Sequence, residues 1–405
     1  MTLAIFTRQI GHYHDARFRG AVDVIGDVTI ISTANEGGFA EFVHRKPLNY
    51  SVIKLFEMRT DYDAAVAKGN LAPSVEDALS SLKPTCIAVS GWTNPESMAA
   101  IRWGRRNNVP LIMMSESQSD DAARSRVREA VKHRVVSLCD AALVGGPPHA
   151  DYVETLGIPR NRVHFGYNAV DNAYFSAGVS VATADAKALR AALRLPKRYL
   201  LASARFIEKK NLPVLVEAFA GAIVQSDVGP IDLVILGDGP EKPRILEAAR
   251  ASGVLDRIHL PGFRGYDVLP AYYGLADGFV HVSTVEQWGL VVNEAMASGL
   301  PVIVSDRCGV ARSVVKDWQT GFVTTPDKAS VERAIGSFLT LGDEAREAMG
   351  LTAQRAIGPW GPKRFGEGMK AAMASAMSTN SRGKAAPWDA AILSWMQQRI
   401  VEAVA

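Results

Sequence analysis

The sequence predicts an α/β protein built from two doubly wound parallel sheets. Its 405 residues exceed what one ordinary core contains, so we expect two domains of about 150–200 residues each. Short apolar runs alternate with stretches of helical periodicity, which is typical of parallel strands joined by crossover helices. This alternation occurs twice, before and after a stretch from Asp171 to Ala186 that lacks periodicity and is expected to be an exposed connection.

The apolar runs locate the expected strands. In the first series they are Leu3–Phe6, Val28–Ile31, Ser51–Phe56, Cys86–Val89, Leu111–Met114 and Ala141–Val144. In the second series they are Tyr199–Ala202, Leu233–Leu236, Ile258–Leu260, Phe279–Val282, Val302–Val304 and Phe322–Thr324. We therefore expect domains at residues 1–176 and 177–384. An amphipathic helix, Trp388 to Val404 within residues 385–405, is expected to return to the first domain.

Bulk composition excludes several classes of protein. With 48% hydrophobic and 21% charged residues, the chain is neither disordered nor a coiled coil. A net charge of +3 and the lack of any recognition motif argue against a nucleic-acid partner. Three scattered cysteines show no metal-ligand spacing, and no run is long enough to span a bilayer. A cytoplasmic protein is expected.

The segment from His281 to Asp306 has the pattern strand, loop, helix, strand. Glu286 lies in the loop and Glu294 on the helix that follows. Ligands of parallel α/β sheets bind beyond the carboxyl ends of the strands, where carboxylates can accept hydrogen bonds from sugar hydroxyls. Acids near a helix N-terminus also complement the helix dipole, so a capping role is equally compatible with this pattern.

Two cations follow the strand that begins at Tyr199. Arg205 comes directly after the strand, and Lys210 lies at the entry to the helix Leu212 to Phe219. A guanidinium and an ammonium beside a helix N-terminus form an anion site suited to a diphosphate. The alternative is a pair of solvated surface cations. Combined with the two carboxylates, the cations suit a nucleotide sugar.

Four patterns in the second half of the chain occur in an order that resembles the retaining glycosyltransferases of family 4. They are RFIEKKN (205–211), LVILGDGP (233–240), IHLPGF (258–263) and EQWGLVVNE (286–294) followed by AMASGLPVIVSD. The first half matches more loosely, through VETLGIPRNRV and YNAVD. The resemblance implies the GT-B architecture: two Rossmann-like domains facing each other across a cleft, with the C-terminal helix packing back on the first domain.

The resemblance also implies roles for individual residues. Arg205 and Lys210 would hold the donor pyrophosphate, Glu286 the hydroxyls of the donor sugar, and Glu294 the ribose. These three residues, Arg205, Lys210 and Glu286, are the catalytic candidates. Further donor-binding positions are Gly11, Phe263, Arg264, Gln287, Trp288, Gly289 and Leu290. The implied reaction is transfer of a hexose-type sugar from a nucleotide diphosphate sugar to a hydroxyl of a glycan, glycolipid or small molecule, with no metal or other cofactor.

The chain departs from the family on the side expected to bind the acceptor. Family members commonly carry a glycine pair where this chain has Gly11-His12, and a histidine where it has Ser115-Glu116-Ser117-Gln118. Glu116 either replaces that histidine or is a solvated loop acid. His12, His14 and Arg17 are the other acceptor-side candidates, and a core or surface role for each histidine is equally open.

Other interpretations are kept open. Asp61-Tyr62-Asp63 is a D-x-D pattern that binds a metal and diphosphate in a different glycosyltransferase architecture. The basic run from Arg124 to Arg134 is either solvated or a peripheral contact with anionic lipid at the inner face of the membrane. A hydrolysing epimerase and a non-catalytic nucleotide-sugar-binding protein are the alternatives to a glycosyltransferase.

Overall fold

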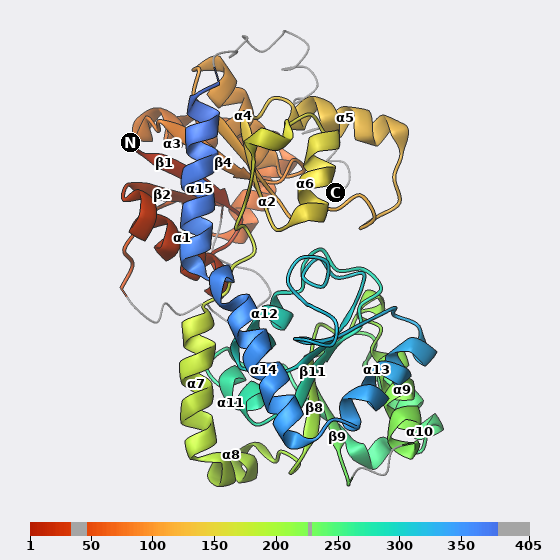
Figure 1. Ribbon diagram of the computed structural model, residues 1–405. Helices are drawn as coiled ribbons and strands as arrows, with labels where there is room; N and C mark the ends of the chain where they lie inside the picture. Colours follow the sequence, from red (N-terminus) through yellow and green to blue (C-terminus); the bar gives the residue numbers. More distant parts are fainter. Residues whose placement is uncertain (34–46, 226–228, 380–405) are drawn as a thin grey trace. The chain divides into compact units, whose positions relative to one another are not determined.

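The chain forms two α/β domains, each built around its own parallel sheet (Figure 1). The computed structural model describes residues 1–33, 47–225 and 229–379. The first domain combines Met1–Ala169 with a helix contributed by the chain from Pro362, and the second comprises Val170–Gly361. The prediction of two doubly wound domains is confirmed.

The first sheet has seven strands in the order β3-β2-β1-β4-β5-β6-β7, and every described pairing is parallel. The strands are β1 (Leu3–Thr7), β2 (Val28–Ser32), β3 (Ser51–Lys54), β4 (Cys86–Ser90), β5 (Leu111–Ser115), β6 (Ala141–Val144) and β7 (Val163–Phe165). The first six match the predicted apolar runs. Strand β7 was missed, because three residues are too few to show an apolar run.

Helices cover both faces of the first sheet. Buried side chains of α2 (Arg59–Ala67), α3 (Leu71–Leu82), α4 (Pro95–Arg106), α5 (Arg126–Val136) and α6 (Pro147–Thr155) form one core with one face. The other face is covered by α1 (His12–Ile25) and α15 (Pro362–Met377). The core on this other face of the first sheet therefore depends on two helices, α1 and α15, that are far apart in the sequence.

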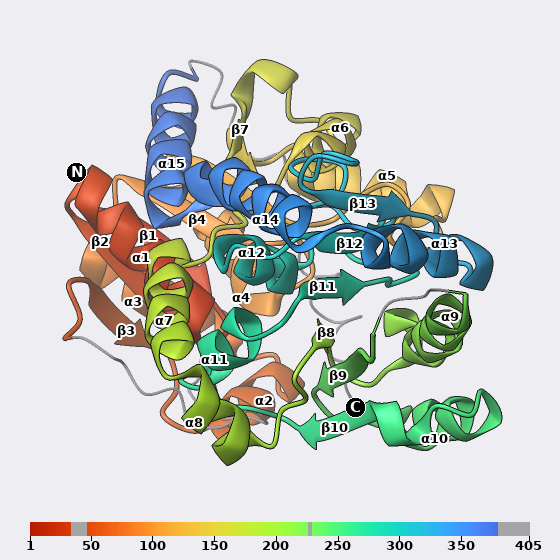
Figure 2. The same cartoon turned by 60° about the horizontal axis from the view of Figure 1, so that its bottom comes forward.

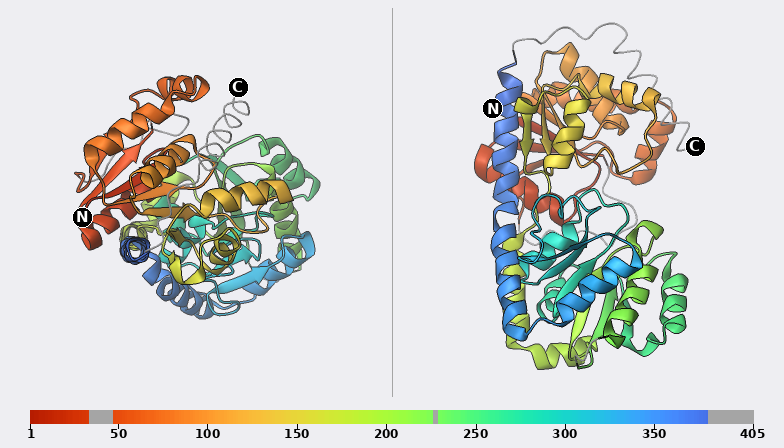
Figure 3. Two further views of the ribbon diagram at one scale, coloured as in Figure 1. Left: turned by 90° about the horizontal axis from the view of Figure 1, so that it is seen from above. Right: turned by 45° about the vertical axis from the view of Figure 1, so that its right-hand side comes forward.

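Helices α1 and α15 touch backbone to backbone, as the ribbon in Figure 3 shows for the blue helix beside the red elements. A Cβ atom at Gly20 would lie 2.1 Å from the carbonyl oxygen of Pro362, and one at Gly366 would lie 2.1 Å from that of Gly20. The return to the first domain was predicted at residue 385, but it occurs at Pro362. The predicted helix Trp388 to Val404 lies outside the described residues.

The second sheet has six strands in the order β10-β9-β8-β11-β12-β13, which can be followed in Figure 2. The strands are β8 (Tyr199–Ser203), β9 (Asp232–Leu236), β10 (Ile258–Gly262), β11 (Gly278–His281), β12 (Val302–Ser305) and β13 (Gly321–Thr324). All six overlap the predicted runs. The order reverses between β8 and β11, and ligands of open α/β sheets bind at such a reversal.

The helices of the second domain are α7 (Asn172–Ala184), α8 (Ala186–Leu193), α9 (Leu212–Val224), α10 (Lys242–Ala251), α11 (Leu269–Gly274), α12 (Leu290–Ala297), α13 (Lys328–Leu339) and α14 (Asp343–Ile357). The stretch from Asp171 to Ala186, predicted as an exposed connection, is mainly helix α7. Asp171 caps it by accepting a hydrogen bond from the backbone N–H of Tyr174, and Phe175 packs edge-on against Tyr273. The first boundary therefore lies after Ala169 rather than after residue 176.

Among the residues that the structure describes, no helix combines the length and apolar character needed to cross a membrane. The three cysteines are buried free thiols.

Candidate functional site

Backbone contacts hold together the loops that follow β8, β9 and β10. The N–H of Phe206 donates to the carbonyl of Asp238 at 2.8 Å, and the N–H of Gly237 donates to that of Gly262 at 3.1 Å. Gly237 has φ +124°, and a Cβ atom there would lie 1.9 Å from the carbonyl oxygen of Ala204. Only glycine permits this close approach, so the GDGP turn supports the loop that carries Arg205.

The structure places Arg205 and Lys210 differently. Arg205 is exposed in the loop after β8, and its guanidinium has no hydrogen bond or ion pair to any described residue. Lys210 ends a short 3₁₀ turn (Glu208–Lys210) and is partly buried. Its ammonium donates to the carboxylate of Glu286. One predicted cation is thus available to a ligand, while the other already has a carboxylate partner.

Asn211 fixes the position of Lys210. It adopts a left-handed conformation with φ +59°, which asparagine tolerates better than most residues. Its side-chain amide donates to the carbonyls of Val282 at 3.2 Å and Pro326 at 2.7 Å. The turn carrying Lys210 is therefore attached to the end of β11 and to the loop after β13. Sequence reasoning did not single out Asn211.

Glu286 lies at the centre of a small polar cluster. Its Oε2 accepts from Lys210 and lies 3.1 Å from Nε2 of His281, and its side chain is 14% exposed. Burial alone would raise the pKa of Glu286. The hydrogen bond and charge interaction with His281 and the nearby ammonium of Lys210 outweigh burial and lower the pKa to about 2. Glu286 is therefore an ionised hydrogen-bond acceptor at neutral pH.

His281 is a site residue that the sequence analysis named only as the start of a segment. It ends β11 and is buried, and burial lowers its pKa. Its Nε2 also lies 3.1 Å from the hydroxyl oxygen of Ser283. The available signal was a polar residue at the end of an otherwise apolar strand.

Helix α12 begins directly after this cluster. Gly289 precedes it with φ +99°, a conformation that favours glycine, and Leu290 is its first residue. Glu294 lies on its second turn and is only 1% exposed. Its Oε2 accepts a hydrogen bond from the hydroxyl of Tyr273 at 2.7 Å. Glu286 and Glu294 thus belong to one strand–loop–helix unit.

Trp288 does not present its side chain at the surface. It is 1% exposed, its indole N–H donates to Oδ1 of Asn293 at 2.9 Å, and its ring centroid lies 4.9 Å from that of Trp360. The assignment of Trp288 to the donor side is therefore corrected for its side chain, which belongs to the core. Its neighbour Gln287 is partly exposed.

Phe263 and Arg264 lie in the loop after β10. The ring of Phe263 is 59% exposed, and Nε of Arg264 donates to the hydroxyl of Tyr272 at 2.9 Å. The exposed ring of Phe263 is therefore accessible at the end of β10, and the donor-binding role of this segment stays a prediction.

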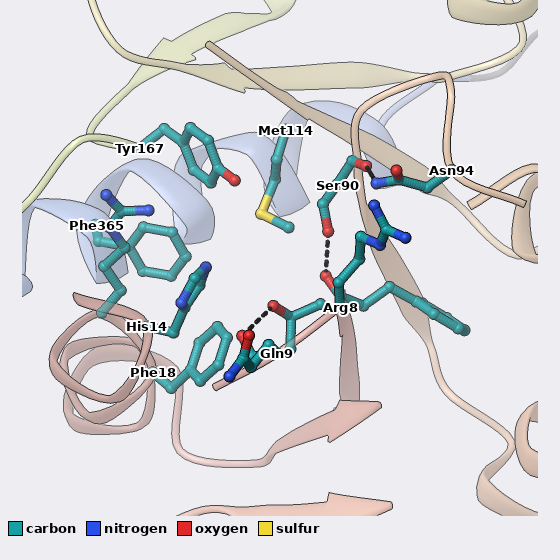
Figure 4. A pocket seen from close by; sticks show the side chains of 12 residues that line it. Arg8, Gln9, His14, Phe18, Ser90, Asn94, Met114, Tyr167 and Phe365 are labelled. Carbon is teal, nitrogen blue, oxygen red and sulfur yellow. Dashed lines mark hydrogen bonds between the residues drawn. The ribbon is translucent and has the colours of Figure 1, made fainter. Parts of the chain in front are cut away.

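The first domain contains a cavity of about 240 Å³ at the carboxyl ends of its central strands (Figure 4). His14 and Arg17 line it, and Glu116 approaches Arg17 with Oε1 4.0 Å from Nη2. His12 is not among the lining residues, so it does not join the other acceptor-side candidates. Gly11 precedes α1, and its N–H donates to Nδ1 of His14 at 3.4 Å.

The structure gives the D-x-D pattern a packing role. It lies on α2, where Asp63 pairs with Arg59 at 2.9 Å and the buried hydroxyl of Tyr62 donates to Glu96 at 2.9 Å. Across residues 1–33, 47–225 and 229–379, no group of three or more His, Cys, Asp or Glu side chains is arranged to hold a metal ion.

The basic run from Arg124 to Arg134 is partly engaged by its own domain. Arg124 donates to Asp121 and to the hydroxyl of Tyr152, and Lys132 pairs with Glu129 at 2.8 Å. The exposed cations of this run include Arg126 and Arg128 on helix α5.

Comparison with known proteins finds a family match within the second domain. Residues 185–356 match the family described as glycosyl transferases group 1. The chain is 29% identical over 280 residues to a D-inositol 3-phosphate glycosyltransferase of Salinispora tropica, covering 64% of this chain and 55% of that protein. It is 25% identical over 199 residues to a mannosylfructose-phosphate synthase of Agrobacterium fabrum, covering 46% and 42%. The chain thus spans about half the length of the curated relatives it matches.

Solved structures extend the likeness of the fold to both domains. A sucrose-phosphate synthase from Thermosynechococcus elongatus superimposes with a TM-score of 0.69 at 19% identity, covering 91% of this chain and 97% of that one. The HepE protein of Anabaena in complex with UDP gives a TM-score of 0.69 at 17% identity, covering 93% and 100%. The chain therefore has the GT-B fold of two Rossmann-like domains, and its second domain matches the group 1 glycosyl transferases.

Proposed function

We propose that this protein is a retaining glycosyltransferase of family 4. It moves a hexose-type sugar from a nucleotide diphosphate sugar to a hydroxyl group. The observation that carries the proposal is the Lys210–Glu286 pair beside the N-terminus of α12, within a region that matches the group 1 glycosyl transferases. Lys210 can bind an anion, and the ionised carboxylate of Glu286 can accept hydrogen bonds. In contact with each other, they suit a ligand that carries both a diphosphate and sugar hydroxyls.

Each side chain has a distinct task in this proposal. Arg205 and Lys210 bind the diphosphate and stabilise the charge that develops on the leaving group. Glu286 accepts hydrogen bonds from the sugar hydroxyls because it is ionised at neutral pH. Glu294 is assigned to the ribose. The two cations and a helix N-terminus supply positive charge at the diphosphate, so the proposed reaction requires no metal.

The first-domain cavity is the proposed acceptor site. It lies at the carboxyl ends of β1, β4 and β5, where parallel α/β sheets bind ligands, and is lined by His14 and Arg17.

Contact with anionic membranes also remains a proposal, with Arg126 and Arg128 as the exposed cations of the basic run. Reversing both charges should reduce sedimentation with anionic vesicles at low salt. Equal sedimentation of the two proteins would contradict the proposed membrane contact.

The first experiment identifies the donor. A panel of nucleotide sugars is screened for thermal stabilisation, and the donor that stabilises the protein is then incubated with and without hydroxyl acceptors. Transfer to an acceptor with retained anomeric configuration, read by NMR, supports the proposal. Release of free sugar and nucleotide at an equal rate without any acceptor would favour the epimerase alternative. Tight binding without turnover would favour a binding protein.

Adjacent lysines provide a matched control. Lys210→Ala removes the partner of Glu286, whereas Lys209→Ala removes the same charge one residue away. Lys209 contributes its backbone carbonyl to the site, as the acceptor for the N–H of Thr284 at 2.9 Å, and alanine preserves that carbonyl. Turnover should fall by about 10²-fold or more in Lys210→Ala, as for the loss of one charge-stabilising donor. It should remain close to wild type in Lys209→Ala, and a similar rate for both variants would remove Lys210 from the mechanism.

A further inference from the structure

The first-domain cavity contains a buried arginine, Arg17, one nitrogen of which has no hydrogen-bond partner within the described part of the chain. Arg17 is 3% exposed, its Nε donates to the carbonyl of Ala169 at 3.3 Å, and its guanidinium lies 5.0 Å from the centroid of the Tyr167 ring. Its Nη2 has no hydrogen-bond partner among the described residues. The 4.0 Å separation from Glu116 is too long for a hydrogen bond.

A buried guanidinium nitrogen without a partner is costly, because it has lost its water without gaining an acceptor. Arg17 lines the cavity, so an acceptor atom on a bound molecule can approach it from there. The group that satisfies such a nitrogen best is an anion, since guanidinium bonds to phosphate and carboxylate are charge-assisted.

His14 adds a second donor to the same cavity without adding charge. Burial and the charge of Arg17 lower the pKa of His14 to about 3, so the ring is neutral at physiological pH. Its Nδ1 accepts from the N–H of Gly11, which assigns the ring proton to Nε2. Figure 4 shows the ring among Gln9, Phe18 and Tyr167 at the cavity wall.

Two hydroxyl groups that line the cavity, those of Ser90 and Thr7, already donate hydrogen bonds to backbone carbonyls. Ser90 donates to the carbonyl of Phe6 at 2.6 Å, and Thr7 donates to that of Gln9 at 3.1 Å. Their oxygens are left to accept hydrogen bonds from a ligand's hydroxyl groups. The hydroxyl oxygens of Ser90 and Thr7 therefore add acceptors to a cavity whose donors include Arg17 and His14.

Formal charge favours an anionic ligand as well. Arg8 and Arg17 both line the cavity, and Glu116 is the carboxylate in contact with Arg17. Glu96, near Arg8, has its pKa raised by burial, which favours its neutral form. The two guanidinium groups that line the cavity outnumber the carboxylate in contact with Arg17.

We propose that this cavity binds an acceptor that carries an anionic group, a phosphate or a carboxylate, which Arg17 and His14 hold while a hydroxyl faces Ser90 and Thr7. The inference rests on the proposed glycosyl transfer and names the class of its acceptor. Arg17 selects the acceptor by its charge and takes no part in the bond rearrangement.

The binding experiment uses the whole protein saturated with the nucleoside diphosphate that stabilises it, so that the diphosphate site is occupied. Inorganic phosphate, glucose 6-phosphate, glucuronate and glucose are then titrated separately, followed by ligand-observed NMR. We expect an anionic probe to bind and glucose to bind at least about tenfold more weakly, since a charge-assisted hydrogen bond contributes about that factor or more. Preference for glucose 6-phosphate identifies a phosphate, and preference for glucuronate identifies a carboxylate. Equal binding of all sugars would overturn the inference.

Three variants locate the binding. Arg17→Gln should weaken binding of the preferred anion by about tenfold or more, whereas Glu116→Gln should strengthen it because a competing carboxylate is removed. Arg19→Gln is the matched control: Arg19 is on the same helix, pairs with Asp15 at 2.9 Å and does not line the cavity. If Arg17→Gln fails to fold, Glu116→Gln decides the question. Unchanged affinity in that variant would overturn the inference.

Nucleoside diphosphate binding separates the two proposals. Donor binding and transfer to neutral acceptors, combined with no anion preference, would overturn this inference alone. Failure of every nucleotide sugar to bind would overturn the proposed function and this inference with it.

Discussion

Lys210 and Glu286 form an ion pair between the loop after β8 and the loop after β11, although they are 76 residues apart in the chain. Each is at most 14% exposed, so the pair is largely shielded from water. Without a ligand, the ammonium neutralises the carboxylate. A bound diphosphate would therefore share an ammonium that is already oriented, rather than order a flexible surface lysine.

The depressed pKa of Glu286 makes the stability of the protein depend on pH. The value falls from an ordinary 4.5 to about 2 in the folded protein, so ionised Glu286 stabilises the fold above pH 4.5. This contribution is lost as the pH falls from 4.5 towards 2. We expect Glu286→Gln to show a weaker loss of unfolding free energy over this range. Chemical denaturation at a series of pH values measures it, and identical profiles would contradict the assignment.

Asn211 should affect turnover through the position of Lys210. Asn211→Gly keeps the left-handed backbone but loses the bonds to Val282 and Pro326. We expect a loss of about 1–3 kcal/mol of stability for two hydrogen bonds, and a reduced kcat. Asn211→Ala should cost about 1 kcal/mol more, because alanine resists the left-handed conformation. Wild-type kcat in a folded Asn211→Gly variant would show that Lys210 does not need this support.

Gly237 is expected to tolerate no side chain. In Gly237→Ala, the new Cβ would collide with the carbonyl of Ala204, so we expect a loss of about 2 kcal/mol or more and weaker donor binding through Arg205. Gly336→Ala is the matched control, because Gly336 lies within α13 and a Cβ atom there meets nothing within 4 Å. That substitution should stabilise the protein by about 0.5–1 kcal/mol. Thermal unfolding of both variants measures the contrast, and equal midpoints would refute it.

Trp288→Phe distinguishes a core residue from a ligand contact. The substitution removes the donor to Asn293 and part of the packing on Trp360. We expect about 1–3 kcal/mol of destabilisation with little change in nucleotide affinity. Denaturant titration and calorimetry with the nucleoside diphosphate provide the two readouts. A large loss of affinity at unchanged stability would restore Trp288 to the donor site.

The strands were predictable because a strand buried on both faces leaves an uninterrupted apolar run, as in Leu233 to Leu236. Helix α7 was not predictable, because its sequence is rich in alanine, serine and threonine. Its buried residues, Phe175 and Ala182, therefore do not stand out as an apolar stripe. Local sequence patterns also could not reveal the roles of Asn211 and His281, or that Nη2 of Arg17 lacks a partner among the residues that the structure describes. Their roles arise from contacts with backbone and side chains that are distant in sequence.

In the candidate site, too, some features could be predicted from the sequence and others could not. Glu286 and Lys210 could be selected from the sequence, since strand ends mark where ligands of such sheets bind. Their direct contact could not be predicted, because the sequence does not reveal which loops meet at the edge of the sheet. Trp288 was assigned to the donor side through the family resemblance alone, and a match of motifs does not reveal that its ring packs on Trp360.

Helix α15 imposes an order on biosynthesis. The first domain needs Phe365, Met369 and Met373 to cover the sheet face that also packs Phe18 of α1. A nascent chain therefore exposes an apolar surface until the ribosome has passed Met377, by which time Val170–Gly361 has been translated. The domain that is synthesised first can therefore be completed only after the second domain has been translated, and chains that terminate before Pro362 would be natural clients for chaperones.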